Sequence, residues 1–189
     1  MPGTPAVARK NSLAVWYIAI GCRGALAVIF LIAVAGKAAR RGAFREFTAS
    51  LAAIRVIPSR ATAPAAVITV SAEALVIVLA ASPVHAAAIA GCALAAGLAA
   101  AFSGAIAVSL RHGNRAPCRC FGRSATPLGA RHLTRNAILL TISVTGITAS
   151  AASGTAHLPG AVVAAGAGLV AGLAIAAFDE IAELIAPSR

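Results

Sequence analysis

The sequence contains few charged and few aromatic residues. Of its 189 residues only 11% are charged and 4% aromatic, with one tryptophan, one tyrosine and one methionine. Soluble domains carry roughly 25% charged residues, so this composition excludes an ordinary soluble domain. Hydrophobic residues make up 60% of the chain, and the mean hydropathy is +0.90. These values are typical of an integral membrane protein.

Acidic residues are especially scarce. Five Asp and Glu stand against 16 Lys and Arg, which gives a formal net charge of +11. The basic residues flank apolar segments and form no tract, and there are too few aromatic residues to build stacking platforms for bases. We therefore expect no nucleic-acid partner. Cations beside membrane spans interact with anionic lipid, so the lipid membrane is the expected partner of this charge.

Long apolar runs predict membrane-spanning helices. Roughly 20 helical residues cross a hydrocarbon core of about 30 Å. Five runs meet this length or nearly so, at about residues 13–36, 64–81, 86–110, 137–153 and 159–178. Trp16 and Tyr17 suit interfacial anchors at the start of the first run. A signal peptide ending at Ala33-Val34-Ala35 is a competing interpretation of the same segment.

Residues 38–57 have a different pattern. Phe44, Phe47, Leu51 and Ile54 recur at steps of three, four and three residues, and arginines fall largely off that stripe. This pattern predicts an amphipathic helix in the plane of the interface, with the four apolar side chains directed into the acyl boundary. A short solvated helix packed on the end of the bundle would have much the same location. The expected fold is an all-α membrane bundle of four core transmembrane helices plus a fifth, with one interfacial amphipathic helix.

Two cysteines one residue apart, Cys118 and Cys120, lie in an Arg-rich polar loop between the third and fourth spans. Nearby cations favour the reactive thiolate, and a disulfide closing so small a ring is strained and readily exchanged. The pair therefore indicates a redox dithiol at a membrane surface. Two alternatives stay open: a zinc site completed by His112 and His132, and cysteines without a role.

Three charged residues and two cysteines lie inside apolar spans. Glu73 falls near the middle of the second span, where a carboxylate needs a partner or a proton. Arg23 and Lys37 are the candidates, and Arg23 is favoured, since Lys37 can reach water by snorkelling. Cys22 and Cys92 are predicted at similar depth. A second, membrane-embedded dithiol is conceivable there, whereas simple packing of two small apolar side chains is the alternative.

Several of these elements together resemble the methylamine-utilisation MauE family over about residues 15–150. That family is similar in layout to DoxX-type proteins and in bundle design to the vitamin K epoxide reductase superfamily. The elements are Arg23 and Gly36-Lys37 in the first span, a Phe-containing amphipathic stretch ending in Pro58, Glu73 in the second span, and Cys118-Arg119-Cys120-Phe121-Gly122 after the third.

The resemblance implies a membrane component of thiol–disulfide exchange. Its partners would be a thioredoxin-like protein and a disulfide-rich client enzyme of the methylamine dehydrogenase type. Cys118 and Cys120 would be the exchanging pair, while Glu73 and Lys37 match family positions without an assigned role. No cofactor is certain, and a quinone is one candidate. Whether the chain is an enzyme, a thiol–disulfide oxidoreductase, stays open. A non-enzymatic scaffold for enzyme maturation and a small transporter that uses Glu73 are the alternatives.

The sequence divides into three expected parts. Residues 1–12 are expected to be disordered, residues 13–153 form a MauE-like four-helix membrane domain that includes the Cys-x-Cys loop 111–132, and residues 154–189 hold a fifth transmembrane helix and an acidic tail. The expected location is the cell membrane. The positive-inside rule places loop 111–132 in the cytoplasm. Disulfide chemistry favours the extracytoplasmic face, which is the orientation we expect.

Overall fold

The computed structural model describes residues 5–113, 129–151 and 157–177, with side chains described from residue 13 onward. These ranges contain six helices and no strand. The helices are α1 (Pro5–Ala38), α2 (Ala43–Ala53), α3 (Ser59–Ala81), α4 (His85–Arg111), α5 (Ala130–Ala151) and α6 (Leu158–Ala176). The expected all-α membrane bundle is thereby confirmed.

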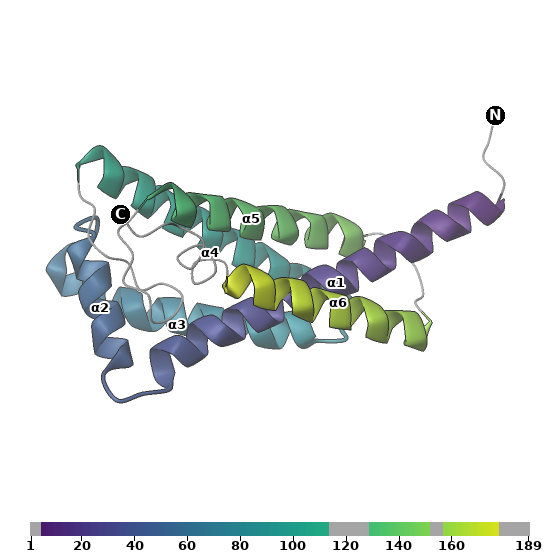
Figure 1. The fold of residues 1–189 in the computed structure, drawn as a ribbon, viewed down its shortest axis with the longest axis horizontal. Helices are drawn as coiled ribbons and strands as arrows, with labels where there is room; N and C mark the ends of the chain where they lie inside the picture. The colour runs from purple at the N-terminus through teal and green to yellow at the C-terminus, as the bar shows by residue number, and fades with distance from the viewer. Residues whose placement is uncertain (1–4, 114–128, 152–156, 178–189) are drawn as a thin grey trace, which may run out of the picture.

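The long helices lie side by side, and the short α2 lies at one end of them (Figure 1). α1 is central, because it contacts α3, α5 and α6, while α4 packs between α3 and α5. The chain turns from α1 into α2 at Gly42, whose φ of 94° is a left-handed conformation that glycine adopts without strain. The opposite end of the bundle carries the tight connection from α3 to α4.

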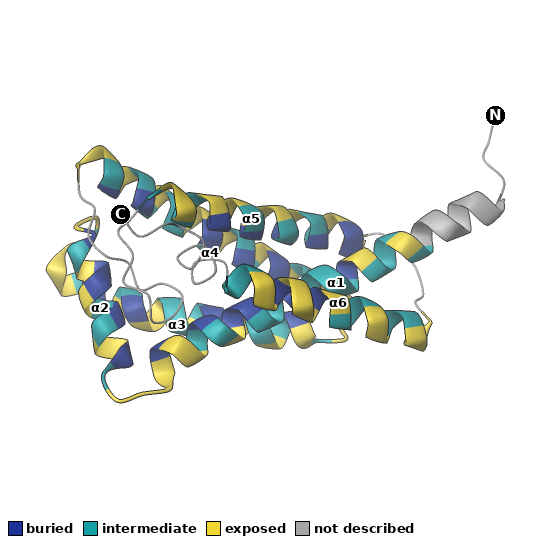
Figure 2. Ribbon diagram, viewed as in Figure 1, coloured by how far each residue is buried: buried dark blue, intermediate teal, exposed yellow. Residues whose placement is uncertain are grey.

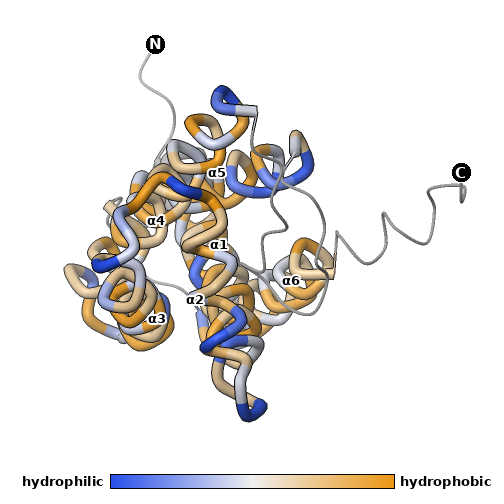
Figure 3. The backbone as a smooth tube through the Cα atoms, turned by 90° about the vertical axis from the view of Figure 1, so that its left-hand side faces the viewer, coloured by the Kyte–Doolittle hydropathy of each residue, from blue (hydrophilic) through white to orange (hydrophobic). Residues whose placement is uncertain are grey.

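Four helices are long and apolar enough to cross a membrane, namely α1 from Leu13, α3, α4 and α6. Helix α5 is more polar, because Arg131, His132 and Arg135 occupy its first turns. It nevertheless packs along α1 and α4 over its length. Seen from the α2 end, hydrophilic segments lie in the connections, and the helix bodies are mostly hydrophobic (Figure 3). The chain is a multi-pass membrane protein.

Burial in the bundle follows the contacts between helices (Figure 2). One core cluster joins α1, α3, α4 and α5 through residues such as Leu26, Ile29, Val76 and Leu139. Large aliphatic side chains point outward elsewhere, among them Ile68, Val78, Val163 and Val170. An exposed apolar surface of this kind marks contact with lipid.

The helix boundaries differ from the predicted spans mainly at the amino ends. Helix α1 begins at Pro5, so part of the segment expected to be disordered is helical. Helix α3 begins at Ser59 rather than at Pro64, with Pro58 as its N-cap and Pro64 inside it. Helix α5 begins at Ala130, ahead of the predicted 137. In each case the helix extends through polar residues, which a search for apolar runs leaves out.

The predicted amphipathic helix exists as α2, but its apolar stripe does not point into the acyl boundary as expected. Phe47, Leu51 and Ile54 are 2%, 7% and 4% exposed and form a second core cluster with Ala66 and Ile106 of α3 and α4. Phe44, at 36% exposed, is the outward member. The stripe therefore packs on protein. The apolar periodicity identifies a buried face without distinguishing lipid from neighbouring helices.

Helices α1 and α6 approach each other closely through small residues. A Cβ added at Gly168 would collide with the backbone of Gly21, and one added at Gly172 would collide with Ala25 and Val28. Ala164, one turn earlier, faces Gly21 as well. These small residues recur every fourth position along α6, a spacing that lets two helix backbones approach closely.

Candidate functional site

A buried ion pair joins α1 to α3. The Lys37 Nζ atom donates to Glu73 Oε1 at 2.7 Å and to Oε2 at 2.8 Å. Both side chains are almost inaccessible, at 3% and 1% exposed. The carboxylate therefore has a cation bound to both of its oxygens, which is the arrangement that lowers the cost of a charge in an apolar bundle.

Lys37 stays buried because α2 covers it. The Phe47 ring lies under the ammonium group, with Nζ 4.9 Å from the ring centroid, a distance suited to a cation–π contact. The prediction that Lys37 snorkels to water was wrong for this reason. Counting residues along the span places Lys37 near the water-facing end of α1. In the structure α2 covers that end.

Arg23 was predicted as the partner of Glu73, and this prediction was wrong too. Its Nε atom donates to the Ala80 carbonyl oxygen at 2.9 Å, and its Nη2 atom donates to the Ser82 carbonyl oxygen. These carbonyls end α3, and the last carbonyls of a helix have no partner within it. Arg23 thus caps α3 at the end of the bundle opposite to α2.

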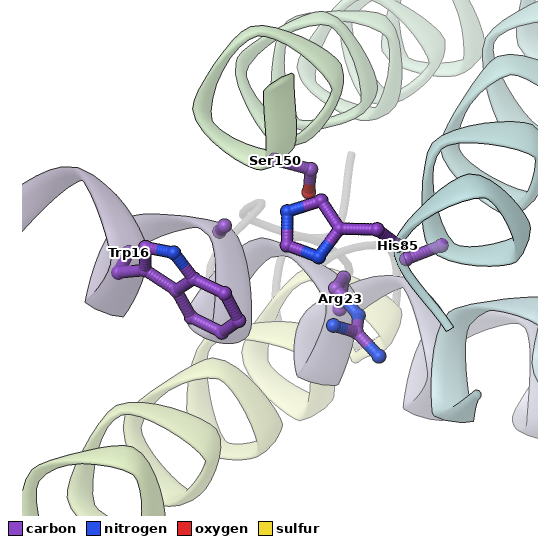
Figure 4. Close-up of a pocket in the computed structure, with 6 residues that line it drawn as sticks. Trp16, Arg23, His85 and Ser150 are labelled. Carbon is purple, nitrogen blue, oxygen red and sulfur yellow. The ribbon is translucent and has the colours of Figure 1, made fainter. Parts of the chain in front are cut away.

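A cleft too narrow to hold a water molecule lies beside Arg23 (Figure 4). Its wall includes Trp16 of α1, His85 of α4 and Ser150 of α5. The indole and imidazole rings are tilted by 56° with centroids 5.3 Å apart. The buried Trp16 Nε1 and Ser150 Oγ atoms have no hydrogen-bond partner among the described residues. In Figure 4 the Ser150 hydroxyl is directed toward the His85 ring.

The two membrane-embedded cysteines also come together. Both are free thiols, Cys92 fully buried and Cys22 partly so. They face Gly146 of α5. A Cβ added at Gly146 would lie 2.9 Å from Cys92 Sγ and 3.3 Å from Cys22 Cβ, so the two side chains share one small space. The prediction of similar depth for this pair holds, and the structure adds that they share a face.

The Cys-x-Cys pair, Cys118 and Cys120, lies outside the described residues. The flanking helices place the ends of its loop. His112 is the exposed C-cap of α4, and His132 lies in the first turn of α5. Within the described ranges no group of three or more His, Cys, Asp or Glu could hold a metal ion. The zinc alternative for the loop stays a prediction.

The model of the family described as "Methylamine utilisation protein MauE" matches residues 15–149, well over half of the chain. The chain belongs to the MauE family. No curated protein matches it, and no solved structure does. The matched segment runs from residue 15 within α1 to nearly the end of α5, so it includes the ion pair, both embedded cysteines and the Cys-x-Cys loop.

Two features of this MauE-family bundle could not be predicted from the sequence. The first is the pocket around His85. In the sequence His85 resembles an ordinary turn residue, and Ser150 is one of many small residues. The second is the burial of Arg135 and Asn136, which are 2% and 5% exposed in α5. Arg135 Nη2 donates to the Ala176 carbonyl oxygen at the end of α6 at 3.2 Å. Both features depend on which helices become neighbours, which no local pattern reveals.

Proposed function

We propose that this MauE-family protein is a membrane component of thiol–disulfide exchange, in which Cys118 and Cys120 are the exchanging pair. The family match carries this proposal, because it covers the loop that holds both cysteines and because the family is named for methylamine utilisation. The partner is a thioredoxin-like protein, and the client is a disulfide-containing enzyme of the methylamine dehydrogenase type.

The exchange needs no other group to balance. One cysteine thiolate of the pair attacks the disulfide of the partner, which forms a mixed disulfide and releases one partner thiol. The second cysteine then attacks the mixed disulfide. The Cys118–Cys120 bond forms, and the partner leaves as a dithiol, having gained two electrons and two protons. The reverse sequence reduces the pair. A one-residue spacing favours rapid exchange, because a strained disulfide is the more readily attacked.

The Lys37–Glu73 pair has an architectural role in this proposal. It is closed off under α2 and ties the last turn of α1 to α3. A transport role for Glu73 is less well supported, since its carboxylate is 1% exposed and already holds a cation through both oxygens. The pair instead fixes the end of the bundle from which the α4–α5 loop departs.

We place the loop on the extracytoplasmic face of the cell membrane, because disulfides persist in oxidising compartments. The clustered arginines at the α2 end favour the opposite orientation by the positive-inside rule. A membrane-impermeant maleimide applied to intact spheroplasts tests the orientation. Labelling of Cys118 and Cys120 before lysis is the expected result, and labelling only after lysis would place the loop in the cytoplasm.

Trapping of the mixed disulfide tests the exchange itself. In a Cys22→Ser/Cys92→Ser background, a further Cys120→Ser change leaves one loop thiol, which should hold a thioredoxin-like protein as a covalent complex that reductant releases. The matched control is the parent that retains both loop cysteines, in which the second thiol resolves the complex. Equal yields of the complex from variant and parent, or none from the Cys120→Ser and Cys118→Ser variants alike, would refute the exchange.

A further inference from the structure

A hollow lies between α2 and the first turns of α3. It has a volume of about 480 Å³ and is open to the surroundings. Its walls include Phe44, Arg45 and Thr48 of α2 and Ser59, Thr62 and Ala63 of α3. The two threonine hydroxyls donate to carbonyl oxygens one turn earlier in the chain, so they need no partner from an occupant. The hollow therefore presents a mostly apolar surface with one cationic side chain, that of Arg45.

The hollow lies at the level where lipid headgroups meet acyl chains. Helix α3 has 23 residues, which at 1.5 Å per residue is about 34 Å, slightly more than a hydrocarbon core of about 30 Å. Its first residue, Ser59, therefore lies at headgroup level, and Ala63 lies one turn deeper. Val67 follows after one further turn on the same face and is 53% exposed. The hollow thus continues into the lipid-facing surface of α3, along which an acyl chain can lie.

The chain around the hollow carries positive charge that the described residues do not balance. The exposed arginines of this segment are Arg41, Arg45, Arg55 and Arg60. The described residues contain two carboxylates, those of Glu46 and Glu73, and each already binds a cation. An anionic group from outside the described chain can therefore bind here with favourable electrostatics.

We propose that the hollow is a binding site for one anionic phospholipid, whose phosphate is bound by Arg45 and Arg60 and whose acyl chain lies over Ala63 and Val67. A guanidinium group matches phosphate oxygens, because its N–H donors can form two parallel hydrogen bonds. A zwitterionic lipid offers the same chains, but its headgroup brings a cation beside the arginines. Charge therefore selects between lipids, and the apolar walls favour a lipid over a phosphate ester dissolved in water.

This site is separate from the thiol chemistry of the loop. Neither Cys118 nor Cys120 contributes to the hollow, and lipid binding is measured without any thiol reagent. The lipid site can therefore exist if the two cysteines do not exchange, and it can fail while they exchange normally.

A single tryptophan in the wall of the hollow measures which lipid binds there. The full chain carries Phe44→Trp as the reporter and Trp16→Phe, which removes the native tryptophan. It is reconstituted in phosphatidylcholine with increasing fractions of phosphatidylglycerol whose brominated chains quench a tryptophan on contact. We expect the site to prefer phosphatidylglycerol over phosphatidylcholine by about tenfold or more, as two arginine contacts would give.

The matched control is Val170→Trp in the same background, on α6, where the native side chain is 67% exposed. Its quenching should follow the bulk lipid composition, with a ratio of affinities close to one. A ratio close to one at the Phe44→Trp reporter as well would overturn the proposal.

Charge variants test the phosphate contacts. Arg45→Gln and Arg60→Gln should each lower the preference for phosphatidylglycerol at the Phe44→Trp reporter by about fivefold. Arg111→Gln is the matched control, because Arg111 is exposed at the same end of the bundle, on α4, and does not line the hollow. Equal effects of all three changes would show a general surface charge and would overturn a defined site. All three side chains are exposed, so we expect folded variants, which circular dichroism verifies.

The acyl contact has its own test. Ala63→Phe fills the hollow without a change in charge and should abolish the preference, whereas Ala100→Phe, at an exposed position of α4, should leave it unchanged. Equal preferences in these two variants would overturn the placement of the chain. Glycerophosphoglycerol, the headgroup without its chains, should not displace the brominated lipid even in large excess. Recovery of fluorescence with this soluble ester would show that the site recognises the headgroup alone and would overturn the lipid as its occupant.

Discussion

Removal of the Glu73 charge should destabilise the bundle more than any other conservative change to a carboxylate in the described chain. At 2.7 Å and an effective dielectric constant of about 20, the Coulomb attraction between the ammonium and the carboxylate is about 6 kcal/mol. Desolvation of both groups offsets much of this attraction. The measurable quantity is the penalty that remains when one charge is left buried without the other, which is about 3–5 kcal/mol.

The change Glu73→Gln preserves the size of the side chain and removes its charge. It leaves the Lys37 ammonium buried at 3% exposure against the Phe47 ring. The ring cannot replace the carboxylate, since a cation–π contact contributes up to about 2 kcal/mol when desolvated. We therefore expect the free energy of unfolding to fall by about 3 kcal/mol or more.

The control is the same chemical change at the surface. Glu46 forms an ion pair with Arg40 at 2.8 Å, but the two side chains are 41% and 50% exposed. Exposed pairs of this kind contribute at most about 1 kcal/mol, so Glu46→Gln should change the free energy of unfolding very little. Both losses are measured by unfolding in mixed micelles with increasing dodecyl sulfate, followed by the fluorescence of Trp16, which is the single tryptophan.

The double variant Lys37→Met/Glu73→Gln decides whether the two residues act as a pair. Since it removes both charges, it should be more stable than Glu73→Gln alone, with a coupling energy of about 2 kcal/mol. Additive losses in the double variant would refute the pair. Equal losses for Glu73→Gln and Glu46→Gln would refute the claim that burial makes the difference.

Three further outcomes follow from the packing. Arg23→Gln should lower the unfolding free energy by an amount that simply adds to that of Glu73→Gln, since Arg23 binds carbonyls at the end of α3; a coupling above about 0.5 kcal/mol would contradict this. Phe47→Ala should lower the free energy of unfolding by about 3–5 kcal/mol, and Phe44→Ala should lower it far less. Similar losses for the two variants would indicate that the apolar stripe of α2 faces outward after all. Gly168→Val should separate α6 from α1, whereas Gly166→Val, with nothing within 4 Å, should not; protease protection of α6 distinguishes them.

The helices themselves could be predicted from the sequence because lipid imposes a simple rule. Each span must satisfy its own backbone and present apolar side chains, so long apolar runs identify it. The small residues of α6 could be recognised for a related reason, since close approach of two backbones needs the absence of side chains. The first turns of α3 and α5 are polar, so neither apolar runs nor small-residue spacing identifies them. The predicted starts of these two helices therefore differ from the observed ones.

The partner of Glu73 could not be predicted from the depth of each residue along its span alone. An estimate from depth alone treats each span as an isolated helix in the membrane. On that assumption Lys37 lies near water. The structure adds α2 across that end and the Phe47 ring beneath the ammonium group. Amphipathic periodicity shows that α2 has an apolar face, but lipid and protein satisfy such a face equally well. The decision between them depends on tertiary contacts.

Buried polar groups of the described bundle differ in whether they have a hydrogen-bond partner. Lys37 and Glu73 satisfy each other at the α2 end, so nothing further is needed to hold their charges in an apolar setting. Trp16 Nε1 and Ser150 Oγ at the opposite end are buried without a partner among the described residues, next to two free thiols. Removing one member of a satisfied buried pair is costly, and a buried donor without a partner already carries a cost in free energy. The exchange that we propose lies at the α2 end, where the α4–α5 loop departs and where the buried charges already satisfy each other.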